Sequence, residues 1–120
     1  MSAGAGPDRL GQRFYVITAS PTGRAGDRHV ATEAHLAWLK RLEVSGILFL
    51  AGPFVQEDGR STGGGMFIVR AGSLAEAEEL AAGDPYNAGG FRTYSVAPWR
   101  LDQGGFALSV SLAGQTVRFT

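Results

Sequence analysis

The 120-residue chain contains no cysteine, which excludes disulfide bonds, thiolate metal ligands and a cysteine nucleophile. Its formal net charge is zero, with 11 basic and 11 acidic residues, so no overall field draws it to nucleic acid or to an anionic membrane. No apolar run approaches the roughly 20 residues of a membrane-spanning helix, and the first residues lack the apolar core of a signal peptide. We therefore expect a cytoplasmic protein with neither nucleic acid nor membrane as a partner.

What the chain does contain suits one folded domain. Hydrophobic residues make up 44% of the sequence and charged residues 18%, and the length is sufficient for one core. The first residues are small and polar, so we expect residues 1–12 to form a flexible arm. We expect the folded domain over residues 13–100 and a C-terminal extension over residues 101–120.

A predicted helix over residues 28–45, ended by Gly46, carries the most informative residue. At about 100° per residue, His35 falls within the apolar stripe of this helix, while Glu33 and Lys40 lie on the opposite face. The other members of the stripe are Ala31, Trp38, Leu39 and Leu42. A half-polar ring on a buried face needs a hydrogen-bond partner, or it costs roughly 1–3 kcal/mol. That partner is either a backbone carbonyl, as for many core histidines, or a second functional side chain.

Four apolar segments rich in β-branched and aromatic residues predict strands. They cover residues 14–18, 47–51, 66–70 and 91–96, and Gly52 and Pro53 are expected to end the second. With two helices, the order is strand–helix–strand–strand–helix–strand. This order predicts a ferredoxin-like α+β fold, an antiparallel four-stranded sheet with both helices on one face.

The second helix and the tail have their own local signals. A capping box, with Ser73 as the cap and Glu76 three residues later, opens the helix, and Gly83 closes it. We expect Leu74, Ala77 and Ala81 to face inward. After the fourth strand, alternating apolar residues over 106–110 and 116–119 predict a C-terminal β-hairpin.

The second face of the predicted sheet needs a cover. Residues 47–51 are apolar on both faces of their strand, and residues 14–17 are nearly so. A second copy of the same sheet, related by a two-fold axis, would cover this face, so we expect a homodimer. The alternative cover is the C-terminal hairpin, folded back over the sheet.

Asp84 is the second candidate for chemistry. It directly follows the second helix, where the helix dipole disfavours a carboxylate, although an aspartate before Pro85 is also a common start of a turn. If Asp84 reaches His35, its carboxylate would orient the imidazole of a general base; the spacing alone does not decide this. With two histidines and no carboxylate cluster, we expect no metal site, and we expect no cofactor.

Five short motifs in order resemble the YciI-like (YCII-related) protein family. They are residues 33–39 (EAHLAWL), 51–54 (AGPF), 65–69 (GMFIV), 84–86 (DPY) and 96–99 (VAPW), and together they span residues 13–100. The resemblance implies a ferredoxin-like fold in a dimeric α+β barrel, similar to that of muconolactone isomerases. One branch of the family resembles dehydrochlorinases of chlorinated hydroxyquinols, and some relatives occur beside transcription sigma factors.

The resemblance also implies an active site that pairs His35 with Asp84. Gly52, Pro53 and Phe54 would border its pocket, and Arg28 resembles a basic position of the family.

We therefore expect a small enzyme without a cofactor that acts on a small oxygenated substrate. His35 would take a proton, Asp84 would orient the ring, and Trp38 and Phe54 would form apolar walls. Backbone N–H groups near Gly52 would stabilise a developing enolate. The alternatives are a dimeric module that binds a metabolite without turnover, and a structural domain in which the pair only fixes the fold. Solvent access to His35 and Asp84 distinguishes the structural domain from the enzyme and the binding module, because a purely structural pair is closed to solvent.

Overall fold

The computed structural model describes residues 12–26 and 28–120, and of Gln12 and Arg28 only the backbone. Residues 1–11 of the expected arm therefore lie outside the described residues. The chain divides into two compact units, Arg13–Arg100 and a second that contains Leu101–Thr120. No helix in the described residues is long and apolar enough to cross a membrane.

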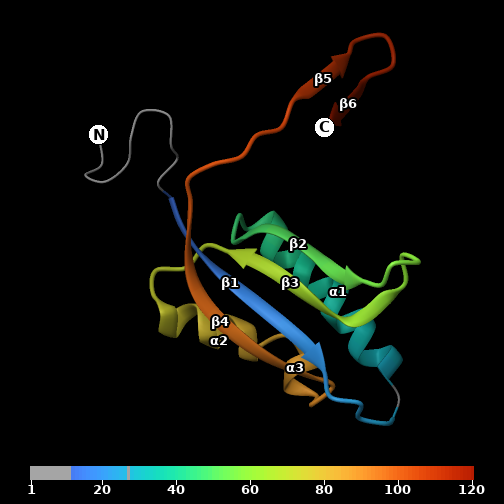
Figure 1. Cartoon of the computed structure of the whole chain (residues 1–120), viewed down its shortest axis with the longest axis vertical. Helices are drawn as coiled ribbons and strands as arrows, with labels where there is room; N and C mark the ends of the chain where they lie inside the picture. The colour runs from blue at the N-terminus through green and yellow to red at the C-terminus, as the bar shows by residue number, and fades with distance from the viewer. Residues whose placement is uncertain (1–11, 27) are drawn as a thin grey trace. The chain divides into compact units, whose positions relative to one another are not determined.

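A four-stranded sheet forms the centre of the 13–100 unit, with its strands in the order β2-β3-β1-β4 (Figure 1). Strand β3 pairs antiparallel with both β1 and β2. The helices lie on one face of the sheet. The elements are β1 (Gln12–Pro21), α1 (Arg28–Val44), β2 (Leu48–Val55), β3 (Ser61–Val69), α2 (Leu74–Ala82), α3 (Pro85–Ala88) and β4 (Arg92–Leu101). The ferredoxin-like prediction is confirmed, with the short helix α3 as an addition.

The core lies between the sheet and the helices. Alternate residues of β1 and β3 point to the helical face, because side chains alternate along a strand. The register places Tyr15 opposite Val69 and Ile17 opposite Phe67, and all four are almost completely buried. Ala77 and Ala81 of α2 complete this cluster.

The edge strands are longer than the sequence predicts. Strand β2 continues through Gly52 and Pro53 to Val55, and Pro53 lies opposite Gly65. Strand β4 likewise continues through Pro98. Both strands are at an edge of the sheet, where a residue without an N–H donor is tolerated. The prediction that Gly52 and Pro53 end the second strand was therefore wrong.

The capping box at the start of α2 is present. Ser73 Oγ accepts a hydrogen bond from the Glu76 backbone N–H at 3.1 Å, and the Glu76 carboxylate accepts one from the Gly72 N–H at 2.7 Å. Ala77 and Ala81 are fully buried as expected. Leu74, however, is 41% exposed, so its predicted inward position was wrong.

The face of the sheet opposite the helices is aromatic. Phe14 stacks on Phe49 with ring centroids 4.7 Å apart and lies 6.2 Å from Trp99. Leu50 and Met66 also belong to this face by register and are 58% and 38% exposed. We call Phe14, Phe49, Leu50, Met66 and Trp99 the aromatic sheet face. Within the described part of the 13–100 unit, no helix lies on it.

The C-terminal unit contains the predicted hairpin. Strands β5 (Leu108–Ser111) and β6 (Thr116–Phe119) pair antiparallel, with Leu108 opposite Phe119 and Val110 opposite Val117. The turn holds Gln115 at φ 52°, in the left-handed region.

Candidate functional site

Helix α1 presents His35 to the interior. His35, Trp38 and Leu42 are buried along one stripe of the helix, while Glu33 and Lys40 on the opposite side are exposed. The other histidine, His29, is at the exposed start of the helix, 3.6 Å from Glu33 Oε1 one turn later. His35 is thus the histidine whose ring must find its partner inside the protein.

That partner is Asp84. His35 Nδ1 and Asp84 Oδ1 are 2.8 Å apart, although 49 residues separate them in the chain. A carboxylate oxygen accepts hydrogen bonds, so Nδ1 carries the proton and Nε2 is the ring nitrogen with a free lone pair. The described residues show no hydrogen bond to Nε2.

The local backbone holds Asp84 in place. Asp84 is the N-cap of α3, and its Oδ1 also accepts a hydrogen bond from the Tyr86 backbone N–H at 3.0 Å. The sequence argument that a helix dipole disfavours this carboxylate was therefore wrong, because the residue begins a new helical turn where an acidic cap is favourable. Asp84 Oδ2 is buried without a hydrogen-bond partner among the described residues.

Aromatic rings enclose the imidazole. The Tyr86 ring stacks against it with centroids 4.4 Å apart, and the rings of Trp38 and Phe67 lie at 6.0 and 5.8 Å. Tyr86 is itself fixed, because its hydroxyl donates a hydrogen bond to Thr32 Oγ1 at 2.6 Å. These contacts restrict the orientation of the His35 ring.

A buried cation supports Tyr86. The Arg92 guanidinium carbon lies 4.3 Å from the centroid of the Tyr86 ring, a cation–π distance, and Arg92 Nε donates to the Gly63 carbonyl at 2.8 Å. Sequence analysis did not identify Tyr86, Thr32 or Arg92 as parts of the site. Thr32 lies three residues before His35 on one helix, so helical spacing was a signal for that residue alone.

Solvent meets the pair at the histidine. The Asp84 side chain is fully buried, while 8% of the His35 side chain remains exposed. The accessible part of the pair therefore belongs to the His35 side chain, and the carboxylate supports it from the interior.

Of the other described residues expected at the site, one contacts the His35–Asp84 pair and those on β2 do not. Trp38 contacts the His35 ring, as described. Gly52, Pro53 and Phe54 are exposed on β2, and in the described residues no hydrogen bond or ring contact joins them to the pair. The Arg28 side chain lies outside the described residues.

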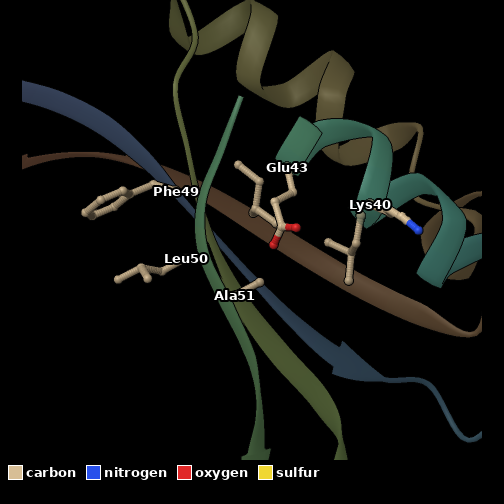
Figure 2. Close-up of a pocket in the computed structure, with 7 residues that line it drawn as sticks. Lys40, Glu43, Phe49, Leu50 and Ala51 are labelled. Carbon is tan, nitrogen blue, oxygen red and sulfur yellow. The ribbon is translucent and has the colours of Figure 1, made fainter. Parts of the chain in front are cut away.

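A hollow of about 420 Å³ lies between α1 and the edge strand β2. Figure 2 shows Lys40 and Glu43 on α1 beside it, while Phe49 and Leu50 point to the far side of β2. Neither His35 nor Asp84 lines this hollow. Within the described ranges, no group of three histidine, aspartate or glutamate side chains is arranged to hold a metal ion.

Residues 14–100 match the YCII-related domain. The chain belongs to the YCII-related domain family. It is 31% identical over 87 residues to the uncharacterized protein YjpA of Bacillus subtilis (strain 168), which covers 72% of this chain and 94% of YjpA. The matched YCII-related span contains both His35 and Asp84 and leaves the C-terminal hairpin outside.

A solved structure of the same fold is that of 5-chloro-2-hydroxyhydroquinone dehydrochlorinase, TftG, from Burkholderia phenoliruptrix AC1100, in complex with 2,5-dihydroxybenzoquinone. The TM-score is 0.57 at 24% identity, over 73% of this chain and 93% of TftG. This likeness supports the α+β fold expected of a YCII-related protein.

Proposed function

We propose that this YCII-related protein is a small cytoplasmic enzyme that needs no cofactor and removes a proton from a small oxygenated, cyclic substrate. The observation that carries the proposal is the 2.8 Å contact between His35 Nδ1 and a fully buried Asp84, with the remaining exposure of the pair on the His35 side chain. This arrangement leaves Nε2 as the proton acceptor, and a histidine base contributes typically 10²–10⁴-fold to a rate.

In the proposed mechanism each residue has one task. His35 Nε2 takes a proton from a carbon next to a carbonyl, or from one next to a carbon that bears a leaving group. Asp84 holds the tautomer and stabilises the imidazolium that forms. Trp38 and Phe54 supply apolar walls, and backbone N–H groups near Gly52 stabilise the developing enolate. The electron pair of the broken C–H bond then moves to the carbonyl oxygen or expels the leaving group.

A homodimer is part of this proposal. Leu50 and Met66 leave apolar surface on the aromatic sheet face, and a second copy packed there by a two-fold axis would cover it. The exposed Phe54 would then lie close to a second chain, which would help to enclose a substrate. TftG, which has this fold, holds a small cyclic quinone, and this agrees with the substrate class proposed here.

A second candidate function is structural. The small exposure of His35 and the capping role of Asp84 both suit a pair that ties α1 to α3 without chemistry. In that case loss of the pair would reduce stability alone.

The experiment that separates the two is solvent deuterium exchange. The protein is incubated in D₂O with small cyclic ketones, lactones and chlorinated hydroxyquinols, and proton NMR follows loss of the C–H signal or of the parent compound. We expect exchange or elimination with the wild type and a loss of about 10²-fold or more with His35→Ala. Equal rates for the wild type and folded His35→Ala would contradict the proposal.

A further inference from the structure

The C-terminal hairpin has two chemically different faces. Residues opposite each other in an antiparallel pair lie on the same face, so the register sorts the side chains. Ser109 lies opposite Arg118 and Ser111 opposite Thr116, which makes one face polar. The other face, here called the apolar hairpin face, consists of Phe106, Leu108, Val110, Val117 and Phe119.

This apolar face is exposed within its own unit. Its five side chains are each 63–76% exposed, and the rings of Phe106 and Phe119 contact each other at a centroid distance of 6.4 Å. Ala107 and Thr120 exchange both backbone hydrogen bonds at the open end of the hairpin, so they form a hydrogen-bonded pair. Hydrogen-bonded and non-hydrogen-bonded pairs alternate along the strands, so Leu108–Phe119 and Val110–Val117 are non-hydrogen-bonded pairs. Side chains of such non-hydrogen-bonded pairs lie closest together, which makes the apolar surface continuous.

An isolated two-stranded hairpin is marginally stable in water, and a third surface against its apolar face is what normally stabilises it. Large contiguous apolar patches typically mark an interaction site on a soluble protein. The hairpin lies outside the matched residues 14–100, so its partner need not be one that the whole family shares.

The charges of the segment favour a copy of itself as that partner. From residue 103 to the end, the one charged side chain is Arg118, and the register places it on the polar face. A two-fold contact brings each residue of a patch against the same patch, so a charged patch repels its copy and an uncharged one does not. Two apolar hairpin faces can therefore pack together while both Arg118 side chains stay in water.

We infer that the apolar hairpin faces of two chains pack against each other and form a small four-stranded sandwich that joins copies of this protein. The contact is independent of the His35–Asp84 pair and of the aromatic sheet face. Each chain contributes only two four-residue strands to this contact, so it adds to the association of the domains instead of replacing it.

The absence of cysteine allows a direct test. In the full chain, Ser109→Cys places one spin label per chain on the polar face, and double electron–electron resonance measures the distance between chains. Packed sheets lie about 10 Å apart, and each label extends outward from its sheet, so we expect a defined distance of roughly 20–30 Å. On this labelled background, Val110→Asp should abolish that distance. Ser111→Asp, the matched change on the polar face, should leave it intact.

Sedimentation provides the second measurement. Val110→Asp in the unlabelled chain should lower the average mass, or raise the dissociation concentration at least tenfold, whereas Ser111→Asp should behave as the wild type. A wild-type sample without a defined distance in this range would overturn the inference, as would a distance that Val110→Asp leaves unchanged, or a mass and a dissociation concentration that it both leaves unchanged. Either result would assign the apolar hairpin face to a different partner.

Discussion

Asp84 Oδ1 lies 2.8 Å from His35 Nδ1 and 3.0 Å from the Tyr86 backbone nitrogen, so one carboxylate oxygen fixes both a side chain of α1 and the first turn of α3. The same contact thus serves the fold and the proposed chemistry. Substitutions at and around the pair can separate the two contributions.

Removal of the ring should reduce stability. His35→Ala leaves the fully buried Asp84 carboxyl without its side-chain partner and creates a cavity among aromatic rings. We expect the free energy of unfolding to fall by about 2–4 kcal/mol, measured by urea denaturation at neutral pH. The matched control is His29→Ala on the same helix, which should change it by less than about 0.5 kcal/mol because His29 is exposed. Similar losses for both variants would contradict the buried pair.

Tyr86 should contribute to the stability of the fold through its hydroxyl as well as through its ring. Tyr86→Phe keeps the stacking on His35 but removes the 2.6 Å hydrogen bond to Thr32. We expect a loss of about 1 kcal/mol in the free energy of unfolding, because the partly buried hydrogen bond between the two side chains is lost. Tyr94→Phe, at a more exposed tyrosine on β4, is the control and should be nearly neutral. Equal effects of the two substitutions would show that the Thr32 contact is unimportant.

Two glycines in neighbouring strands should respond differently to alanine. A Cβ at Gly64 would clash with the Ala19 carbonyl oxygen, whereas nothing lies within 4 Å of a Cβ at Gly52. We expect Gly64→Ala to destabilise the domain by about 1–3 kcal/mol and to lower the thermal midpoint, because the β1–β3 backbones must separate. Gly52→Ala should leave the midpoint nearly unchanged, and a larger loss there than at Gly64 would contradict this register.

The helix cap at Ser73 should contribute measurably to the free energy of unfolding. Ser73→Ala removes the acceptor of the Glu76 N–H and should cost about 1 kcal/mol in denaturant unfolding. Ser73→Asp restores an acceptor at the same place, so it should recover most of the loss. A Ser73→Asp variant as unstable as Ser73→Ala would argue against the capping role.

The order of elements was predictable from the sequence because each element has a local signal. The stripe around His35, the capping box at Ser73 and the alternation in the tail correspond to α1, α2 and the β5–β6 hairpin. The ends of the strands were not predictable, since Pro53 and Pro98 are tolerated only because β2 and β4 lie at the edges of the sheet. Edge position is a property of the tertiary fold and has no local signal.

The site was predictable only in part for a similar reason. The buried stripe identified His35 as a ring that needs a partner. The position of Asp84 after the second helix made it a candidate, and the family resemblance suggested that the two residues pair. Distance along the chain could not show that the two meet, because the packing of α1 against α3 brings them together. Arg92 is a clear case of a residue that sequence analysis missed, since its position under Tyr86 depends on the pairing of β4 in the sheet.

The tautomer of His35 shows whether Asp84 orients the imidazole ring. A long-range ¹H–¹⁵N spectrum of the two histidines distinguishes an imidazole protonated at Nδ1 from one protonated at Nε2, and the exposed His29 is an internal reference. We predict that neutral His35 carries its proton on Nδ1 in the wild type, with Nε2 free to accept one, and that Asp84→Ala removes this preference. A wild-type His35 protonated at Nε2, or a preference for Nδ1 that persists in Asp84→Ala, would mean that Asp84 does not prepare His35 as a base.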